Sequence, residues 1–136
     1  MKRNSRLSLA LHTLGHMASN PDRVRKSADI AEHAGTNPVV VRRVLGSLRQ
    51  AGLLVSEAGH SGGWRLARPP NEITLADVYL ALDERLASPE IDTSVHDCSV
   101  EHALLDRVSK VMSEVEQHLI QKLSETTILE IREAAD

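Results

Sequence analysis

Two stretches that each predict a helix are separated by only three residues, Gly35, Thr36 and Asn37. Before this turn, Ser27 is expected to cap the first helix, and Gly35 suits the left-handed conformation that ends it. After the turn, Asn37 and Pro38 place a capping side chain directly before a proline at the first helical position. Helix, tight turn and helix together indicate a helix-turn-helix.

The second helix, predicted over residues 38–50, has an apolar face and a charged face. The charged side carries Val39 and Arg43, with Arg42 and Arg49 along one edge, and the segment contains no acidic residue. This is the pattern of a recognition helix, which enters the DNA major groove. At about 100° per residue, the side chains that share the apolar side are Val41, Val44, Leu45 and Leu48.

Three glycines, Gly59, Gly62 and Gly63, lie between two short predicted strands, residues 53–55 and 64–67. A phosphate loop of the nucleotide-binding kind ends in Gly-Lys-Ser/Thr before a helix, and a dinucleotide site lies between a strand and a helix. Neither pattern is present, so the segment is predicted to be a β-hairpin. A hairpin directly after a recognition helix is a wing.

The predicted wing adds contacts to a DNA backbone. Glycines at its tip allow close approach to a phosphate, and Arg65 and Arg68 can lie along the backbone. Trp64 is expected to pack against the helices rather than to stack on a base.

The flanking segments are mainly helical. An amphipathic first helix is predicted over residues 5–19, and this interpretation is favoured over a signal peptide for the basic, then apolar, N-terminus. Thr74 and Asp77 have the spacing of a capping box and open a further helix. Residues 87–99 show no periodicity and are expected to form a loop. The apolar stripe of the first helix consists of Leu7, Leu11, Leu14 and Ala18.

A long helix is predicted from Val100 onward, over about 25 residues. Its apolar seam needs a partner, either the domain itself or a second copy, and a homodimer is favoured because helix-turn-helix proteins usually read two half-sites. The predicted fold is therefore mainly α, a winged helix-turn-helix with a two-stranded wing and a long C-terminal dimerisation helix. The seam consists of Leu104, Val108, Val111, Val115, Leu119 and Leu123.

The expected organisation is a DNA-binding domain over residues 1–86, a loop over 87–99, and a dimerisation helix with a C-terminal tail over 100–136. The charged residues are also divided unevenly between the two halves of the chain. Residues 1–68 hold eleven Lys/Arg against four Asp/Glu, whereas residues 69–136 hold five against fifteen. A basic half beside an acidic half indicates a polyanion-binding part and a part with another role. One cysteine, and no apolar run long enough for a membrane span, favour a cytoplasmic protein.

The run AGLLVSEAGHSGGWRLARPPNEITLADVYLALDE closely resembles the wing and following helix of the Rrf-two family of bacterial winged-helix transcriptional regulators, the IscR, NsrR and CymR group. GTNPVVVRRVLGSLRQAGLL resembles the recognition helix of a branch of that family without iron–sulfur clusters. The resemblance is specific over residues 35–82 and weak beyond Ser88. It implies a homodimer with crossed C-terminal helices, recognition helices in successive major grooves, and wings in the flanking minor grooves.

The resemblance also implies DNA-contacting residues. Arg42 would address a guanine edge, and Val39 a thymine methyl group. One departure lies at Ala58, where the family often has an arginine that grips the minor groove; Arg65 or His60 would replace it only in part. The implied candidates are Asn37, Val39, Arg42 and Arg43 in the recognition helix, and Gly59, His60, Ser61 and Arg65 in the wing.

The sensing region departs from the family more strongly. Cluster-binding members carry three cysteines in the loop before the long helix, whereas this chain has Cys98 alone. An iron–sulfur cluster requires mostly thiolate ligands, so no cluster and no other cofactor is expected. Cys98 is expected to be a partly buried loop residue, with a redox sensor as the alternative, and a metal site with His96 and His102 is a weak possibility. The scattered His12, His16, His33 and His118 are expected to be surface or packing residues.

These observations predict a transcriptional regulator, specifically a repressor that binds double-stranded DNA as a homodimer at a palindromic operator. Its signal is unknown: thiol redox at Cys98 and an unidentified small-molecule effector are both open. The alternative is a winged-helix protein-interaction module that reads no DNA sequence. An enzyme is not expected, because the sequence offers no nucleophile–base pair, metal motif or nucleotide loop. No membrane partner is expected.

Overall fold

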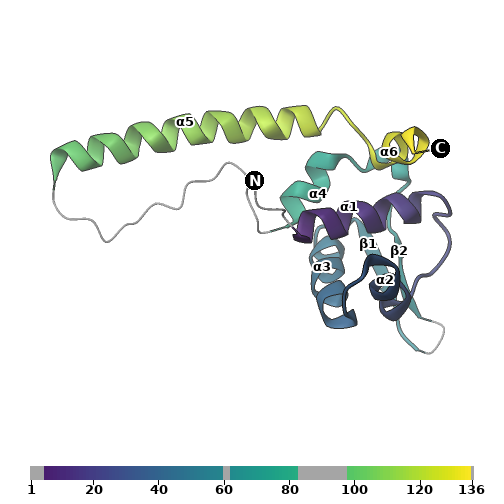
Figure 1. Ribbon diagram of the computed structural model, residues 1–136. Helices are drawn as coiled ribbons and strands as arrows, with labels where there is room; N and C mark the ends of the chain where they lie inside the picture. The colour runs from purple at the N-terminus through teal and green to yellow at the C-terminus, as the bar shows by residue number, and fades with distance from the viewer. Residues whose placement is uncertain (1–4, 60–61, 83–97, 136) are drawn as a thin grey trace.

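The computed structural model describes residues 5–59, 62–82 and 98–135. Its helices confirm the predicted mainly α class, and two antiparallel strands form the wing (Figure 1). None of the described helices is both long and apolar enough to cross a membrane. In chain order the elements are α1 (Ser5–Ala18), α2 (Ser27–Ala34), α3 (Pro38–Gln50), β1 (Leu54–Glu57), β2 (Gly63–Leu66), the short 3-10 helix η1 (Pro70–Glu72), α4 (Leu75–Ala81), α5 (Ser99–Leu123) and α6 (Ile128–Ala134).

The helix-turn-helix is built by the local signals that the sequence carries. Gly35 ends α2 in the left-handed conformation with φ 70°, which glycine adopts without a steric cost. The Asn37 side chain then accepts a hydrogen bond from the backbone N–H of Val40 at 3.0 Å, and Pro38 opens α3. All four apolar residues predicted for the inner side of α3, Val41, Val44, Leu45 and Leu48, are buried in the common core.

The expected cap of α2 is wrong. Ser27 is the first residue of the helix, and Lys26 occupies the N-cap position without a side-chain bond. The Ser27 hydroxyl instead accepts a hydrogen bond from the indole N–H of Trp64 at 2.8 Å. A buried indole requires such an acceptor, and this requirement takes precedence over the local cap.

The two strands pair in register, with Leu54 opposite Leu66 and Glu57 opposite Gly63. The predicted strands are therefore displaced by one or two residues. Trp64 is buried, as expected, and its backbone exchanges two 2.8 Å hydrogen bonds with Arg25, so the segment before α2 borders β2. This contact ties the wing directly to the start of the helix-turn-helix.

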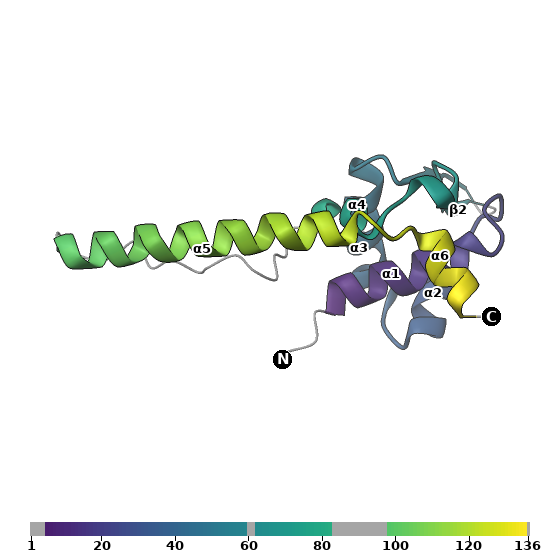
Figure 2. The ribbon, with the colours of Figure 1, turned by 90° about the horizontal axis from the view of Figure 1, so that it is seen from above.

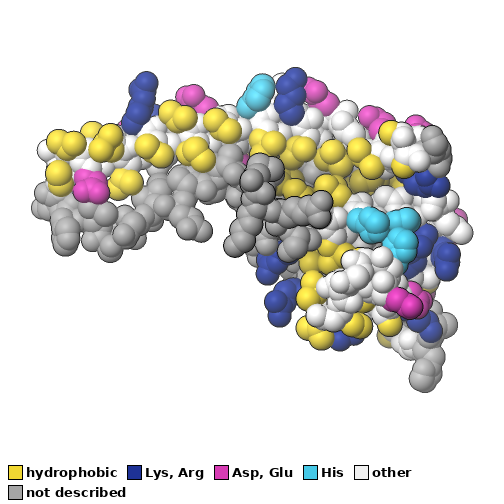
Figure 3. Space-filling view, viewed as in Figure 1, with side chains coloured by type: hydrophobic (Ala, Val, Ile, Leu, Met, Phe, Trp, Pro, Cys, Tyr) yellow, Lys and Arg dark blue, Asp and Glu magenta, His cyan; other side chains and the backbone are white. Residues whose placement is uncertain are grey.

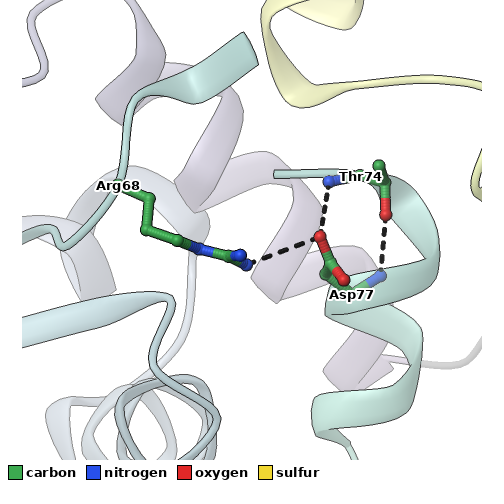
Figure 4. A network of polar contacts seen from close by, with 3 residues as sticks. All are labelled: Arg68, Thr74 and Asp77. Atoms are coloured by element: carbon green, nitrogen blue, oxygen red, sulfur yellow. Dashed lines mark hydrogen bonds and ion pairs between the residues drawn. The ribbon is translucent and has the colours of Figure 1, made fainter. Parts of the chain in front are cut away.

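The end of the wing is fastened to α4. Thr74 and Asp77 form the predicted capping box, in which each side chain bonds the other residue's backbone N–H. Arg68 reaches the same Asp77 carboxylate, with 3.5 Å between Nη2 and Oδ2 (Figure 4).

The C-terminal part consists of the long helix α5 and the short helix α6, and the sequence did not predict α6. α5 projects away from the rest of the molecule as a long arm (Figures 1 and 2), and none of its residues is buried among the described parts of the chain. After it the chain returns to the winged unit, where α6 packs against α1 and Ile128 enters the core. The backbone N–H of Ile128 donates to the carbonyl of Ile73 at 2.9 Å. The expected C-terminal tail is thus in part a helix of the winged unit, whereas most of the expected loop, residues 87–99, lies outside the described residues.

Candidate nucleic-acid interface

The outer face of α3 is exposed at its N-terminal end. Val39 is 57% exposed, and Arg42 and Arg43 are also exposed. Basic side chains accompany α3 in the space-filling view (Figure 3). The side-chain oxygen of Asn37, Oδ1, accepts the capping hydrogen bond from Val40, which leaves the side-chain NH₂ group as a donor. The first two turns of α3 therefore present an apolar contact, a side-chain amide and two guanidinium groups.

A groove of about 360 Å³ separates α3 from the wing. Arg42 lines it from α3, and Gly59, Gly62 and Gly63 line it from the wing, opposite the start of α2. The structure thus brings together two regions of the predicted site that are about 20 residues apart in the sequence. His60 and Ser61, the other predicted wing residues, lie outside the described residues.

The wing glycines are explained by the hairpin itself. A Cβ atom on Gly62 would lie 2.1 Å from the carbonyl oxygen of Glu57, and one on Gly63 would lie 2.4 Å from that of Arg25. Both distances are far below contact, and both neighbours are backbone atoms that cannot rotate away. Gly62 and Gly63 therefore allow the tight turn and the close pairing between β2 and residue 25.

The wing arginines differ in what they contact. The Arg65 Nε atom lies 2.9 Å from Glu57 across the hairpin, and both side chains are more than 40% exposed. An exposed ion pair is weak, typically 0–1 kcal/mol, so Arg65 can exchange Glu57 for a phosphate at little cost. Arg68 is directed to Asp77 and braces α4 instead. Ala58, the residue before the first wing glycine, is exposed.

Arg49 has a supporting role that sequence reasoning did not identify. Its Nη1 atom donates to the Ser56 hydroxyl at 3.1 Å, and its guanidinium lies over the Trp64 ring, 5.9 Å from the centroid. Arg49 therefore links the end of α3 to the base of the wing. The sequence signal for this role was the position of Arg49 at the end of α3, shortly before the hairpin.

Cys98 lies at the N-cap of α5 and is exposed, so the expected partial burial is wrong. It is the chain's one cysteine. An iron–sulfur cluster needs several thiolates, and a single exposed thiol does not fit one. The backbone N–H of His102 donates to the Cys98 carbonyl at 3.0 Å, and His96 lies outside the described residues.

Comparison with known proteins agrees with this geometry. The model of the Rrf2 family (the Rrf-two family), described as an iron-dependent transcriptional regulator, matches residues 3–134. The HTH-type transcriptional regulator YwnA of Bacillus subtilis is 40% identical over 82 residues, which is 60% of this chain and 59% of YwnA. The chain thus covers less than two thirds of that relative.

Two solved structures share the fold over most of their length. A crystal structure described as a DNA binding protein is 28% identical, with a TM-score of 0.74 over 93% of this chain and 97% of that one. CymR of B. subtilis, described as its global cysteine regulator, is 21% identical, with a TM-score of 0.68 over 100% and 99% of the two chains. The family and these relatives are described as regulators or DNA-binding proteins, in line with the prediction that the chain is not an enzyme.

Proposed function

Because the chain belongs to the Rrf2 family of transcriptional regulators, we propose that it binds DNA sequence-specifically as a homodimer and represses transcription from a palindromic operator in the cytoplasm. The observation that carries this proposal is the outer face of α3, where Val39, Arg42 and Arg43 are exposed at the start of a helix whose other face is fixed in the core. A rigid helix with a free basic face suits the major groove.

Each part of the surface has a distinct role in the proposal. Arg42 and Arg43 meet guanine edges or phosphates, and Val39 meets a thymine methyl group. The amide of Asn37 donates near the helix start. The wing approaches the backbone beside α3, through Gly59, His60 and Ser61 at its tip and Arg65 on β2.

Dimerisation is supported by the apolar row on α5. Val100, Leu104, Val108, Val111 and Val115 follow steps of four, four, three and four, and all are exposed, from 46% to 67%. Such a row on one side of a helix pairs well with its own copy across a two-fold axis. Two α3 helices would then address two half-sites, which accounts for a palindromic operator.

The proposal is tested by selecting bound duplexes from random DNA and then measuring affinity for the enriched site. We expect a symmetric enriched sequence and an affinity that falls steeply with salt. The double variant Arg42→Ala/Arg43→Ala should lower affinity at least about 30-fold, since each good bidentate base contact is worth 1–3 kcal/mol.

The matched control is Arg107→Ala/Lys110→Ala, which removes two exposed positive charges from α5 instead. It should bind almost as well as the wild type. Equal losses in both double variants would mean that net charge alone holds the DNA. The absence of any enriched sequence would favour the protein-interaction module.

We also propose Cys98 as the sensor of the regulator, because its thiol is exposed at the start of the arm. Operator binding by wild type and Cys98→Ser, each with and without mild oxidant, tests this. An oxidant effect that disappears in Cys98→Ser supports the sensor; no effect in either protein favours a small-molecule effector.

A further inference from the structure

Three histidines that the sequence scatters come together on one surface. His12 and His16 lie four residues apart on α1 and therefore on one face of the helix, and His33 lies near the end of α2. One ring nitrogen from each residue lies within 4.8 Å of the others. The space-filling view shows this group as a single histidine patch between the two helices (Figure 3). All three are exposed, so the expectation of surface residues holds, but their positions in the sequence did not predict that they meet.

The separation between two of these nitrogen atoms is close to that of ligands of one metal ion. The Nε2 atoms of His16 and His33 are 3.0 Å apart. Two imidazole nitrogens bound to tetrahedral zinc at about 2.0–2.1 Å would be roughly 3.3 Å apart. A shift of a few tenths of an ångström is therefore enough. The His12 ring centroid lies 4.6 Å from that of His16 and 5.2 Å from that of His33, so the third ligand is within reach.

The rings border a pocket of about 120 Å³ that has a polar wall. Thr13 lies on this wall; its residue is only 3% exposed, and its buried hydroxyl has no hydrogen-bond partner among the described residues. A buried hydroxyl without a partner costs about 1–3 kcal/mol. A water or other ligand held at a metal ion beside the histidines would supply the missing partner.

We propose that His12, His16 and His33 bind one divalent transition-metal ion of the zinc class per protomer and thereby join α1 to α2. Imidazole suits zinc, nickel and copper, and three histidines with an open fourth position form a recognised zinc coordination set. The open position would be taken by water beside Thr13. This site is separate from Cys98 and from the DNA-contacting surface of α3.

The alternative is a simple hydrogen-bonded pair of histidines. That pair accounts for His16 and His33 but leaves His12 and the Thr13 hydroxyl without an explanation.

The surrounding charges act in both directions. Arg23 and Arg25 line the pocket, and Arg132 faces His16 from α6; these cations oppose a metal ion, whereas Asp29 on the pocket wall favours one. Burial lowers the pKa of His16, followed by the effects of His12 and His33. The neutral imidazole is the form that binds a metal.

The test is titration of untagged protein with Zn²⁺ by calorimetry, together with Co²⁺ as an absorbance probe of coordination. We expect one ion per protomer, the visible band of tetrahedral Co²⁺, and a Tm increase of about 5–10 °C with Zn²⁺ in excess. His12→Ala, His16→Ala and His33→Ala should each weaken binding at least 10-fold.

The controls separate this site from others. His118→Ala removes an exposed histidine of α5, and Cys98→Ser removes the thiol; both should bind Zn²⁺ as the wild type does. Circular dichroism checks that each variant is folded. No wild-type binding at micromolar Zn²⁺, or unchanged binding in the folded His33→Ala variant, would overturn the proposal.

Discussion

Tyr79 shows how one side chain fixes the arm to the winged unit. It is 1% exposed in α4, and its hydroxyl donates to the Glu116 carboxylate of α5, with oxygen–oxygen distances of 2.9 and 2.8 Å. We expect Tyr79→Phe to lower the free energy of unfolding by about 1.5–3 kcal/mol, because a hydrogen bond to a charged group is lost without a cavity. Urea denaturation measures this.

A double-mutant cycle with Glu116→Gln assigns that loss to the pair. The double variant should be destabilised by clearly less than the sum of the single variants. Additive effects would show that Tyr79 and Glu116 act independently. Glu114→Gln, an exposed neighbour on α5, serves as the charge control and should change stability little.

Single residues also show which roles can be predicted from neighbouring residues in the sequence and which cannot. Asn37, Pro38 and Gly35 act on their own neighbours in the chain, so their roles could be predicted. Ser27 was assigned wrongly because its partner, Trp64, is 37 residues away. The histidine cluster could not be predicted for a similar reason, since nothing local places His33 against His12 and His16.

Among the elements, the wing depends on a glycine that no other residue can replace. Gly63→Ala would push a Cβ atom to 2.4 Å from the Arg25 carbonyl, so β2 and the segment before α2 must separate. We expect a loss of about 1–3 kcal/mol in unfolding free energy, the usual cost of overpacking. Operator affinity should fall as well, because the wing loses its attachment to the helix-turn-helix.

Gly46→Ala is the matched control for this change. Gly46 lies inside α3, and a Cβ atom there meets nothing within 4 Å. Alanine is favoured over glycine inside a helix by up to about 1 kcal/mol, so this variant should be more stable than the wild type. Thermal denaturation of the two variants side by side should give Tm shifts of opposite sign; a stable Gly63→Ala protein would contradict the role assigned to the β2–Arg25 contact.

The elements differ in how far the sequence determines them. α3 and the capping box of α4 follow from short patterns, and the structure confirms both. α6 could not be predicted in this way, because its seven residues carry too little periodicity. Its position depends on packing against α1 and η1, with Ile128 in the core. The bridge between Arg25 and Trp64 is likewise a long-range pairing without a local signal.

At the scale of the whole molecule, the exposed apolar row of α5 calls for a packing partner. The 25-residue helix α5 has no buried side chain among the described parts of the chain. Its hydrogen bond to the winged unit, from Tyr79 to Glu116, lies in the C-terminal half of α5. Its apolar row is 46–67% exposed among the described residues. Burying that row against a second copy gains hydrophobic free energy in proportion to the area covered, about 25 cal/mol per Å².

Val111→Glu tests this pairing, because Val111 lies near the middle of the row and is 47% exposed. In a two-fold dimer the substitution places two carboxylates near the axis, where desolvation and mutual repulsion both oppose association. We expect a monomer by sedimentation at micromolar concentration, with circular dichroism unchanged for the winged unit and operator affinity reduced by the loss of the second half-site. Ser113→Glu adds the same charge to the opposite, exposed side of α5 and should remain a dimer. If both variants sediment as the wild type does, the apolar row of α5 is not the dimer contact, and the two half-sites of an operator would have to be joined through another surface.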